Sequence, residues 1–417
     1  MEIREFKKII NEIIHCKKIL NNARNRLVLF TRRSSLSFQS MLLFLLDMRR
    51  ASLQTRQRSF FQKLSRGMYM SVTKQAVSKR RNDFDHSPFV EMLKSLVAAE
   101  YSAKNRKKEY KGYILMAIDG SYLQLPRSDA LLKEFGYHGS SDLPTAAISV
   151  LYDVLNGWPI DVALTHSNMN ERSEATKHII NLCAMFPHIA RKAIITFDRG
   201  YPSLEMFTFL QEKGVKFVIR CSSKSLKEIN NAPMGDSVVS LKNGLKVRVV
   251  KFTLPTGKTE ILVTNHFELE LNDIIVIYTM RWGVENLFRL LKDSLFIEGF
   301  SGKTVNSIKQ DFYATMVMLI GVAIVRDEGN KIAKTVRKNK KNIHEYAVNV
   351  SNVVTVMREE FIFLLFYESH NDDYLDKINK IMYTVASVVE PVRKGRHYPR
   401  KMGRHPAANF YNKAKYG

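Results

Sequence analysis

The sequence predicts an α/β protein with a helical region on each side of a central sheet, and three observations support this. Residues 113–222 alternate strand-like apolar runs with helical segments, which is the layer pattern of α/β folds. Residues 1–110 have a helical pattern with almost no Gly or Pro, and residues 326–417 begin as helices. Residues 223–270 alternate apolar and polar positions around two turn signals, which predicts a short β meander within the core.

The first part of the chain is strongly basic as well as helical. Residues 1–110 carry 24 Lys and Arg against 9 Asp and Glu, and the whole chain has a net charge of +25. An excess of this size indicates a polyanionic partner, either nucleic acid or an anionic membrane surface. Hydrophobic residues make up 45% of the chain and charged residues 25%, as in ordinary globular proteins.

Within this basic region, residues 71–84 (SVTKQAVSKRRNDF) resemble the second helix of a helix-turn-helix, with Ser71 or Thr73 as its cap. The first helix would lie near residues 60–65 (FFQKLS), which makes the connecting turn longer than usual. One polar stripe of this helix carries side chains of the types that read base edges and phosphates. The stripe consists of Gln75, Ser78, Lys79 and Asn82. A plain basic surface helix explains the same residues equally well.

The core elements follow in order. The pattern predicts a strand at 113–126, a hairpin at 145–167 that turns at Asn156-Gly157, a helix at 171–186, a strand at 193–197, a helix at 203–214 ending at Gly214, and a strand at 216–222. In the insertion, turns are expected at Asn243-Gly244 and Thr256-Gly257.

Two of these core strands run into an aspartate. Asp119 ends the apolar run of the first strand and is followed by Gly120, while Asp198 ends the run at 193–197 and Gly200 stands two residues further on. Two carboxylates at one end of a sheet would repel each other unless a cation lay between them. Oxygen ligands without a Cys or His cluster favour Mg²⁺ or Mn²⁺. Each Asp alone is equally typical of a turn.

The pattern of residues 272–295 predicts a single helix, because the segment contains no Pro and begins with an Asn or Asp that can cap it. Its apolar stripe for the core consists of Ile277, Met280, Val284, Leu287 and Leu291. A second face, about 100° round the helix, carries Tyr278, Arg281, Glu285 and Lys292. A phenol, a guanidinium, a carboxylate and an ammonium on one face suit metal and phosphate chemistry. Taken alone, this face is also typical of an amphipathic helix with a solvated side.

Together these motifs resemble the DDE transposases of bacterial insertion sequences, in particular insertion sequence family four with its Y-x2-R-x3-E-x6-K signature. Here the signature stands as Tyr278, Arg281, Glu285 and Lys292, and the two acid motifs are AIDGS (117–121) and TFDRGYPS (196–203). IEGFSGKTVNSIKQDFYATM (297–316) also resembles the family's continuation.

The resemblance implies an RNase H-like catalytic core in which Asp119, Asp198 and Glu285 are the catalytic acids and bind two Mg²⁺ or Mn²⁺ ions. It also implies that Tyr278, Arg281 and Lys292 bind DNA phosphates at the transposon end. The implied partners are double-stranded DNA with terminal inverted repeats and target DNA, with a homodimer in the DNA complex.

These expectations divide the chain into five parts. They are a helical basic DNA-binding region (1–110), the first part of the RNase H-like core (111–222), the β-strand insertion (223–270), the second part of the core with the signature helix (271–325), and a helical region with a basic tail (326–417).

The insertion bears on how the second DNA strand is processed. In the family such an insertion approaches the DNA end, and in some members it carries a Trp that stacks on a flipped base. This insertion has no Trp, because the chain's tryptophans are Trp158 and Trp282. The candidates for that role are Phe252 in the insertion and Trp282 on the signature helix. If a hairpin intermediate forms, we expect it to depend on Phe252 more than on any other residue of the insertion.

Three widely spaced cysteines indicate a reducing compartment without a disulfide framework, and they give no zinc spacing. The longest uncharged apolar run, Phe312 to Val325, is short for a bilayer span. We expect a cytoplasmic, DNA-associated protein with no membrane partner. Two alternatives to a transposase are a catalytically silent regulator bound to transposon ends and a structure-selective nuclease on the same fold.

Overall fold

The computed structural model describes residues 1–32, 34–47, 52–64, 72–102, 108–139, 142–338, 344–366 and 372–392. The chain forms two compact units. Met1–Leu96 and Asp293–Gly417 together make the first, here called the terminal unit, and Val97–Lys292 make the second, the central unit. The central unit is thus one continuous segment inserted into a unit built from both ends of the chain.

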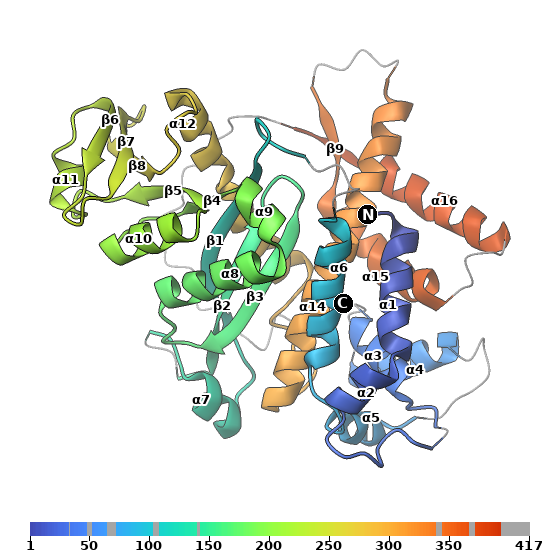
Figure 1. Ribbon diagram of the computed structural model, residues 1–417. Coiled ribbons are helices and arrows are strands. Elements are labelled where there is room, and N and C mark those ends of the chain that lie inside the picture. The colour runs from blue at the N-terminus through green and yellow to red at the C-terminus, as the bar shows by residue number, and fades with distance from the viewer. Residues whose placement is uncertain are drawn as a thin grey trace. The chain divides into compact units, whose positions relative to one another are not determined.

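The described part of the central unit contains a mixed eight-stranded sheet (Figure 1). Its strands are β1 (Ile114–Gln124), β2 (Thr145–Asp153), β3 (Trp158–His166), β4 (Ala193–Phe197), β5 (Lys216–Cys221), β6 (Gly235–Ser240), β7 (Lys246–Thr253) and β8 (Thr259–Thr264). Their order across the sheet is β3-β2-β1-β4-β5-β8-β7-β6. β4 runs parallel to β1 and β5, and the other pairs are antiparallel. The first five strands have the arrangement of an RNase H-like core, which confirms the predicted fold class.

Helices cover this sheet. Those of the central unit are α7 (Asp129–Phe135), α8 (Glu171–Met185), α9 (Pro187–Lys192), α10 (Leu204–Glu212), α11 (Lys227–Asn230), α12 (Leu271–Met280) and α13 (Trp282–Arg289), followed by a π-helix, η1 (Leu290–Ser294). Asn170 and Ser203 cap α8 and α10 by accepting backbone N–H bonds. α8 connects β3 to β4, and α10 connects β4 to β5. Both connections are right-handed and run in the same direction across the sheet, so α8 and α10 lie on the same face of the sheet, as Figure 1 shows.

Residues 223–270 contain the predicted β meander. We expected this meander to be separate from the core sheet, but it forms part of that sheet. β8 pairs with β5, so β6, β7 and β8 continue the same sheet. Gly244 and Gly257 have positive φ angles of 81° and 80° in the two turns, a conformation that glycine adopts without strain. The backbone N–H and C=O groups on the free edge of β5 pair with those of β8, and the insertion therefore extends the sheet.

The first core strand lies within the predicted range 113–126, but its aspartate does not stand at the strand end. Asp119 was expected at the end of its strand, whereas β1 continues beyond it to Gln124. The reason is the long antiparallel partner β2, which pairs with β1 up to Gln124↔Thr145. Asp119 therefore lies in the middle of a strand, where its backbone is held by β2 opposite Val150.

The signature region is not the single regular helix that was predicted. α12 ends at Met280, α13 begins at Trp282, and Arg281 lies at the junction with helical backbone angles. The N-cap is Glu270, which forms a capping box with Asp273, and not the Asn or Asp expected. The predicted apolar stripe is buried at Ile277, Val284, Leu287 and Leu291, while Met280 is partly exposed.

The described part of the terminal unit is mainly helical. It comprises α1 (Ile3–His15), α2 (Lys17–Ala23), α3 (Phe38–Leu46), α4 (Leu53–Leu64), α5 (Lys74–Arg81), α14 (Val305–Val336), α15 (Val350–Phe366) and α16 (Asp372–Ser387), with two short strands, β9 (Tyr346–Val348) and β10 (Val389–Pro391). α6 (Ser87–Glu100) leads from this unit into the central one. Residues 346–348 were expected to be helical, but they pair with β10 as a strand.

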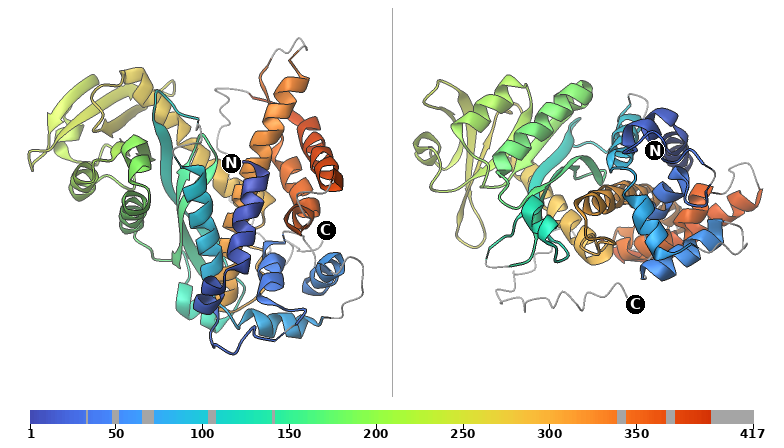
Figure 2. Two further views of the ribbon diagram at one scale, coloured as in Figure 1. Left: turned by 45° about the vertical axis from the view of Figure 1, so that its right-hand side comes forward. Right: turned by 90° about the horizontal axis from the view of Figure 1, so that it is seen from below.

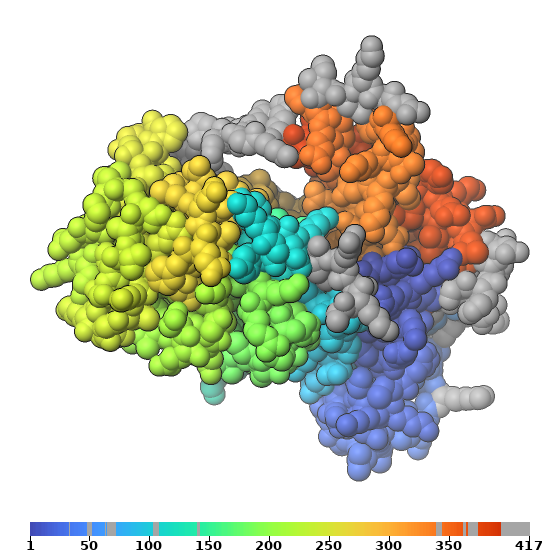
Figure 3. Space-filling view, turned by 45° about the horizontal axis from the view of Figure 1, so that its top comes forward, coloured from blue at the N-terminus to red at the C-terminus, as the bar shows by residue number. Residues whose placement is uncertain are grey.

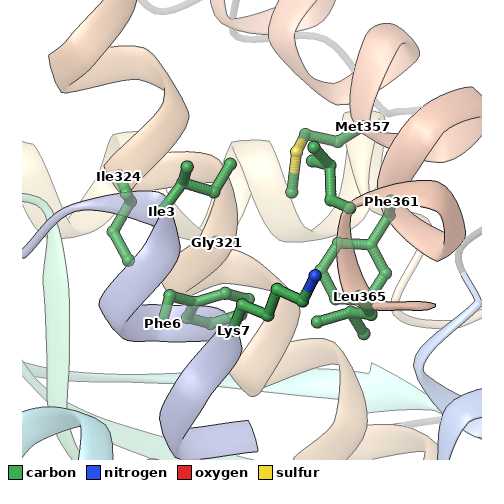
Figure 4. Close-up of a pocket in the computed structure, with 9 residues that line it drawn as sticks. Ile3, Phe6, Lys7, Gly321, Ile324, Met357, Phe361 and Leu365 are labelled. Carbon is green, nitrogen blue, oxygen red and sulfur yellow. The ribbon is translucent and has the colours of Figure 1, made fainter. Parts of the chain in front are cut away.

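α14 is the central helix of the terminal unit. It contacts α1 and α3 from the N-terminal part of the chain and α15 and α16 from the C-terminal part (Figures 2 and 3). A cavity of about 10 Å³ remains where α1, α14 and α15 meet, lined by Phe6, Gly321 and Met357 among others (Figure 4). Among the described residues, α14 is the one helix long and apolar enough to cross a membrane, and 72% of its most apolar window is buried in the structure.

Candidate active site

The parallel register of β1 and β4 brings the two aspartates to one level. Ala117 lies opposite Thr196, and the two aspartates each follow two residues later. Because side chains alternate along a strand, Asp119 and Asp198 occupy equivalent positions on neighbouring strands. Asp119 also accepts a hydrogen bond from the N–H of Gly120 at 2.9 Å. The predicted pair of strand acids therefore meets at one end of the sheet.

The signature helices add the third acid through Arg281. α13 packs on β1, and Arg281 is 7% exposed. Its Nη1 donates to Asp119 Oδ2 at 3.3 Å and its Nη2 donates to Glu285 Oε1 at 2.8 Å. One guanidinium thus bridges an acid of the sheet and an acid of the helix. Arg281 Nε is buried and has no acceptor among the described residues.

A second cation lies beside Asp198. β5 runs parallel to β4 with Ile219 opposite Phe197, so Arg220 stands level with Asp198, and its Nη1 is 3.8 Å from Asp198 Oδ1. The other nitrogen of Arg220 pairs with Glu260 of β8. The hydroxyl of Tyr278 donates to Asp198 Oδ1 at 3.3 Å.

The sequence analysis missed Arg220 and Glu260. The available signal was an Arg at the end of the predicted strand 216–222, which parallel pairing places beside the second acid. Glu260 had no such signal, because its position depends on the pairing of β8 with β5.

Burial governs the electrostatics of Asp119. Desolvation raises the pKa of Asp119 to about 6, and the charges of Asp198 and Glu285 also raise it, although Arg281 and the Gly120 N–H lower it. Desolvation likewise raises the pKa of the Tyr278 phenol, so this group is a neutral hydrogen-bond donor at physiological pH. The site therefore favours additional positive charge.

The donor set fits a divalent cation. Asp119, Asp198, Glu285 and Glu260 face two guanidiniums, those of Arg281 and Arg220, so these six side chains carry an excess of two negative charges. Carboxylate oxygens are the ligands that Mg²⁺ and Mn²⁺ prefer. Within the described residues, no three His, Cys, Asp or Glu side chains are gathered closely enough to hold a metal as they stand. Arg281 bridges two of these acids, Asp119 and Glu285.

The fourth residue of the predicted signature, Lys292, is partly exposed within η1. The wider π-helical turn rotates it away from the position that a continuous α-helix would give it relative to Glu285.

The predicted polar stripe belongs to the terminal unit, and its four side chains are all exposed. They are Gln75, Ser78, Lys79 and Asn82. Thr73 caps α5 by accepting the N–H of Ala76, and Val77 and Phe84 are buried. Ser71, the other predicted cap, lies outside the described residues.

α5 contacts α3 and α4, so a packed helix precedes it as predicted. Arg81, its last residue, is buried and binds Gln310, Asp311 and the carbonyl of Ser307. The guanidinium of Arg81 therefore forms bonds within the terminal unit and does not belong to the exposed stripe.

Comparison with known proteins gives consistent results. A family model described as the transposase DDE domain matches residues 110–320, just over half of the chain. A putative transposase, y4zB, of Sinorhizobium fredii is 25% identical over 186 residues, which are 40% of this chain and 50% of the relative. A probable transposase for insertion sequence element IS5377 of Geobacillus stearothermophilus is 26% identical over 153 residues, 33% of this chain and 41% of the relative. The chain thus spans half or less of the length of these relatives.

Among solved structures, the piggyBac transposase synaptic complex with hairpin DNA is similar with a TM-score of 0.47 and 12% identity, over 96% of this chain and 88% of that chain. The family assignment itself comes from the match to residues 110–320, which contain all three acids and the whole signature. The chain belongs to the transposase DDE domain family.

Proposed function

We propose that this protein is a transposase that cleaves DNA at transposon ends and joins it to target DNA, using two divalent metal ions held by Asp119, Asp198 and Glu285. The observation that carries this proposal is the convergence of these acids with Arg281 at one end of an RNase H-like sheet. The ions, when bound, activate the attacking oxygen and stabilise the leaving one. Mg²⁺ is the expected ion, with Mn²⁺ as a substitute.

The neighbouring donors suit the phosphates of the DNA end. Arg281 has a planar fork of donors for bidentate phosphate binding, and its buried Nε has no acceptor among the described residues. The Tyr278 hydroxyl is a neutral donor, and Lys292 is a point charge at the end of the same helical region. We assign phosphate binding to these three residues. The exposed stripe on α5 is the proposed reader of the end sequence.

The partners follow from this assignment. They are double-stranded DNA with terminal inverted repeats, target DNA and a second copy of the chain in the DNA complex, in the manner of insertion sequence family four. The net charge of +25 supports a nucleic-acid partner. We propose a cytoplasmic, DNA-associated protein.

The proposal is tested with labelled DNA that carries the sequences flanking the gene. The wild type should nick this DNA and join it to a target in Mg²⁺. Asp119→Ala, Asp198→Ala and Glu285→Ala should each abolish both steps and retain end binding within a few fold. Robust nicking in Mg²⁺ by one of these variants would remove that residue from the site.

The same assay separates the two alternatives. A silent regulator bound to transposon ends would bind the DNA without cleaving it in any metal. A structure-selective nuclease would cleave branched or flapped DNA without joining strands. Joining of the end to a target is therefore the product that distinguishes a transposase from both.

A further inference from the structure

A fourth carboxylate lies beside the strand acids, on the residue that begins α8. The structure places the side chain of Glu171 between the chain segments that follow the two aspartates. A Cβ atom added at Gly120 would lie 3.7 Å from Glu171 Oε1, and one added at Gly200 would lie 3.1 Å from Glu171 Oε2. Gly120 directly follows Asp119, and Gly200 is two residues beyond Asp198.

Glu171 approaches the site from the opposite face of the sheet. Successive strand residues point to opposite faces, so Asp119 faces Arg281 of the signature region while position 120 faces α8. Neither Gly120 nor Gly200 has a positive φ, so backbone conformation does not require glycine at these positions. The close approach of the Glu171 carboxylate supplies a reason for glycine at 200, because it is the nearest group to an added Cβ there.

The neighbouring Tyr201 points independently to a ligand at this place. Its ring is 1% exposed, and its hydroxyl is buried without a hydrogen-bond partner among the described residues. Burial is the main cause that raises the pKa of this hydroxyl; the charges of Glu171, Asp119 and Asp198 raise it further, while Arg281 lowers it. A buried hydroxyl left without a partner is costly, and a water molecule bound to a cation would satisfy it.

The Glu171 side chain is partly buried. No hydrogen bond or ion pair joins it to another side chain in the described part of the chain, although Arg172 beside it donates to the Gly200 carbonyl at 3.1 Å. Glu174, one turn later on α8, has a partner, because it accepts a hydrogen bond from Lys177 at 2.6 Å. The two acids in the first turn of α8 therefore differ in that, within the described ranges, only Glu174 has a side-chain partner.

We propose that Glu171 is a fourth acidic residue of the metal centre, whose carboxylate accepts hydrogen bonds from water ligands of the divalent cation, with the Tyr201 hydroxyl binding the same water. This inference rests on the proposed metal-dependent function. Glu171 is a positioning residue, since it acts on the cation through its bound water. Groups of this kind typically alter metal affinity by about 10- to 100-fold.

The test is the affinity of the full-length protein for Mn²⁺, measured by calorimetry and by the electron paramagnetic resonance of free Mn²⁺. Glu171→Gln should weaken binding by about 10- to 100-fold, and Tyr201→Phe should weaken it less. Glu174→Gln removes the same charge from the same helical turn and should bind Mn²⁺ within about twofold of the wild type. Circular dichroism melts show whether each variant is folded.

A second substitution tests the geometry without removing the acid. Gly200→Ala adds a Cβ within 3.1 Å of Glu171 Oε2 and should displace that carboxylate, which weakens Mn²⁺ binding. In the Glu171→Gln background the added methyl should have a much smaller effect, because the two changes act through one interaction. Equal effects of Gly200→Ala in both backgrounds would overturn the placement of Glu171.

Asp119→Asn separates this inference from the proposed function. If Asp119→Asn loses Mn²⁺ while Glu171→Gln binds it like the wild type, the fourth acid is wrong and the metal-dependent function stands. If the wild type itself binds no Mn²⁺ at millimolar concentration, the metal-dependent function fails and this inference fails with it.

Discussion

Arg281 links two of the three proposed catalytic acids. Its guanidinium joins Asp119 to Glu285 from a buried position. A charged hydrogen bond of this kind stabilises by about 1.5–3 kcal/mol. The same residue is the proposed phosphate ligand, so metal and DNA together would replace both of its present partners. We therefore expect Arg281 to stabilise the free protein and to bind phosphate in the DNA complex.

We predict that Arg281→Gln lowers the free energy of unfolding in EDTA by about 1–3 kcal/mol, because two carboxylates lose their cation. Mg²⁺ should stabilise this variant more than the wild type, since the ion takes the place of the guanidinium. Urea denaturation with and without Mg²⁺ measures both effects. Arg127→Gln, which removes an exposed pair with Asp142, is the control. Equal Mg²⁺ responses in the wild type and Arg281→Gln would contradict this prediction.

A second buried acid, Asp153, secures the hairpin between β2 and β3. It is fully buried and accepts hydrogen bonds from the Tyr101 hydroxyl at 2.6 Å and from the backbone N–H groups of Leu155 and Asn156. Burial raises the pKa of Asp153, although these donors lower it. Tyr101 therefore stabilises the ionised carboxylate at the turn.

Tyr101→Phe should lower the free energy of unfolding by about 1–3 kcal/mol at pH 7–8, because the carboxylate loses a donor. The substitution also raises the pKa of Asp153 further. Since a raised folded-state pKa means that the native state takes up its proton first, the deficit should shrink as pH falls through that pKa. Denaturation at several pH values measures this. A deficit that stays constant or grows towards acid pH would be inconsistent with this account.

At the scale of elements, α5 presents a polar stripe and buries its other side. Val77 and Phe84 pack inward, while the four stripe residues are exposed. This arrangement is the one required of a helix that enters a DNA groove, and it is also that of a surface helix. Binding measurements on two DNA sequences separate the two interpretations.

Replacing Gln75, Ser78, Lys79 and Asn82 with Ala should reduce the preference for the transposon end over random DNA. If the stripe contacts phosphates alone, binding to both DNAs should weaken equally and the salt dependence should fall. Competition titrations at several salt concentrations measure these quantities. The control is Lys17→Ala with Lys18→Ala, two exposed cations of α2 in the same unit. Unchanged binding to both DNAs would identify α5 as a structural helix.

The meander offers a second element-scale prediction. Phe252 lies on β7 opposite Glu260 and packs partly buried against the hydrophobic cluster of the sheet, whereas Trp282 on the signature helix is 46% exposed. If second-strand cleavage forms a hairpin, a flipped base gains about 1–3 kcal/mol from an aromatic face. We retain the prediction that this face is Phe252.

Phe252→Leu keeps most of the packing and removes the aromatic ring, so it should preserve first-strand nicking and reduce the hairpin yield. Denaturing gels of the end-cleavage products measure both. Trp282→Leu is the matched comparison on an exposed position. An unaltered hairpin yield in Phe252→Leu would exclude this role for Phe252.

At the scale of the whole molecule, the chain has two units with separate cores. In the terminal unit, α14 packs so closely on its neighbours that a Cβ at Gly329 would lie 2.6 Å from Val385 Cγ1 of α16. Glycine at this position is required by space, because Gly329 has no positive φ. Overpacking at such a site costs about 1–3 kcal/mol.

Gly329→Ala should therefore destabilise the terminal unit by about 1–3 kcal/mol. Hydrogen exchange should accelerate in α14, α15 and α16 more than in the strands of the central sheet, because separate cores open as separate units. Lys331→Ala, an exposed substitution on the same helix, is the control. Equal acceleration in both units would show that they unfold together.

Local chemistry made much of this protein predictable from its sequence. The Asn156-Gly157 turn, the end of helix α10 near Gly214 and the buried stripe of the signature helices each depend on a few neighbouring residues. Such signals also located the three candidate acids, because strand ends and helix faces have short sequence periods. They did not place the break at Arg281 or the π-helix after it, since both depend on how these helices pack.

Only the tertiary structure decided which distant groups share the site. The strand order sets Asp119, Asp198 and Arg220 at one level, and the pairing of β8 with β5 adds Glu260. Crossover through α8 brings Glu171 to the same end of the sheet from the other face. The physical reason is that periodicity states which face a residue occupies, whereas strand pairing between segments far apart in sequence determines its neighbours.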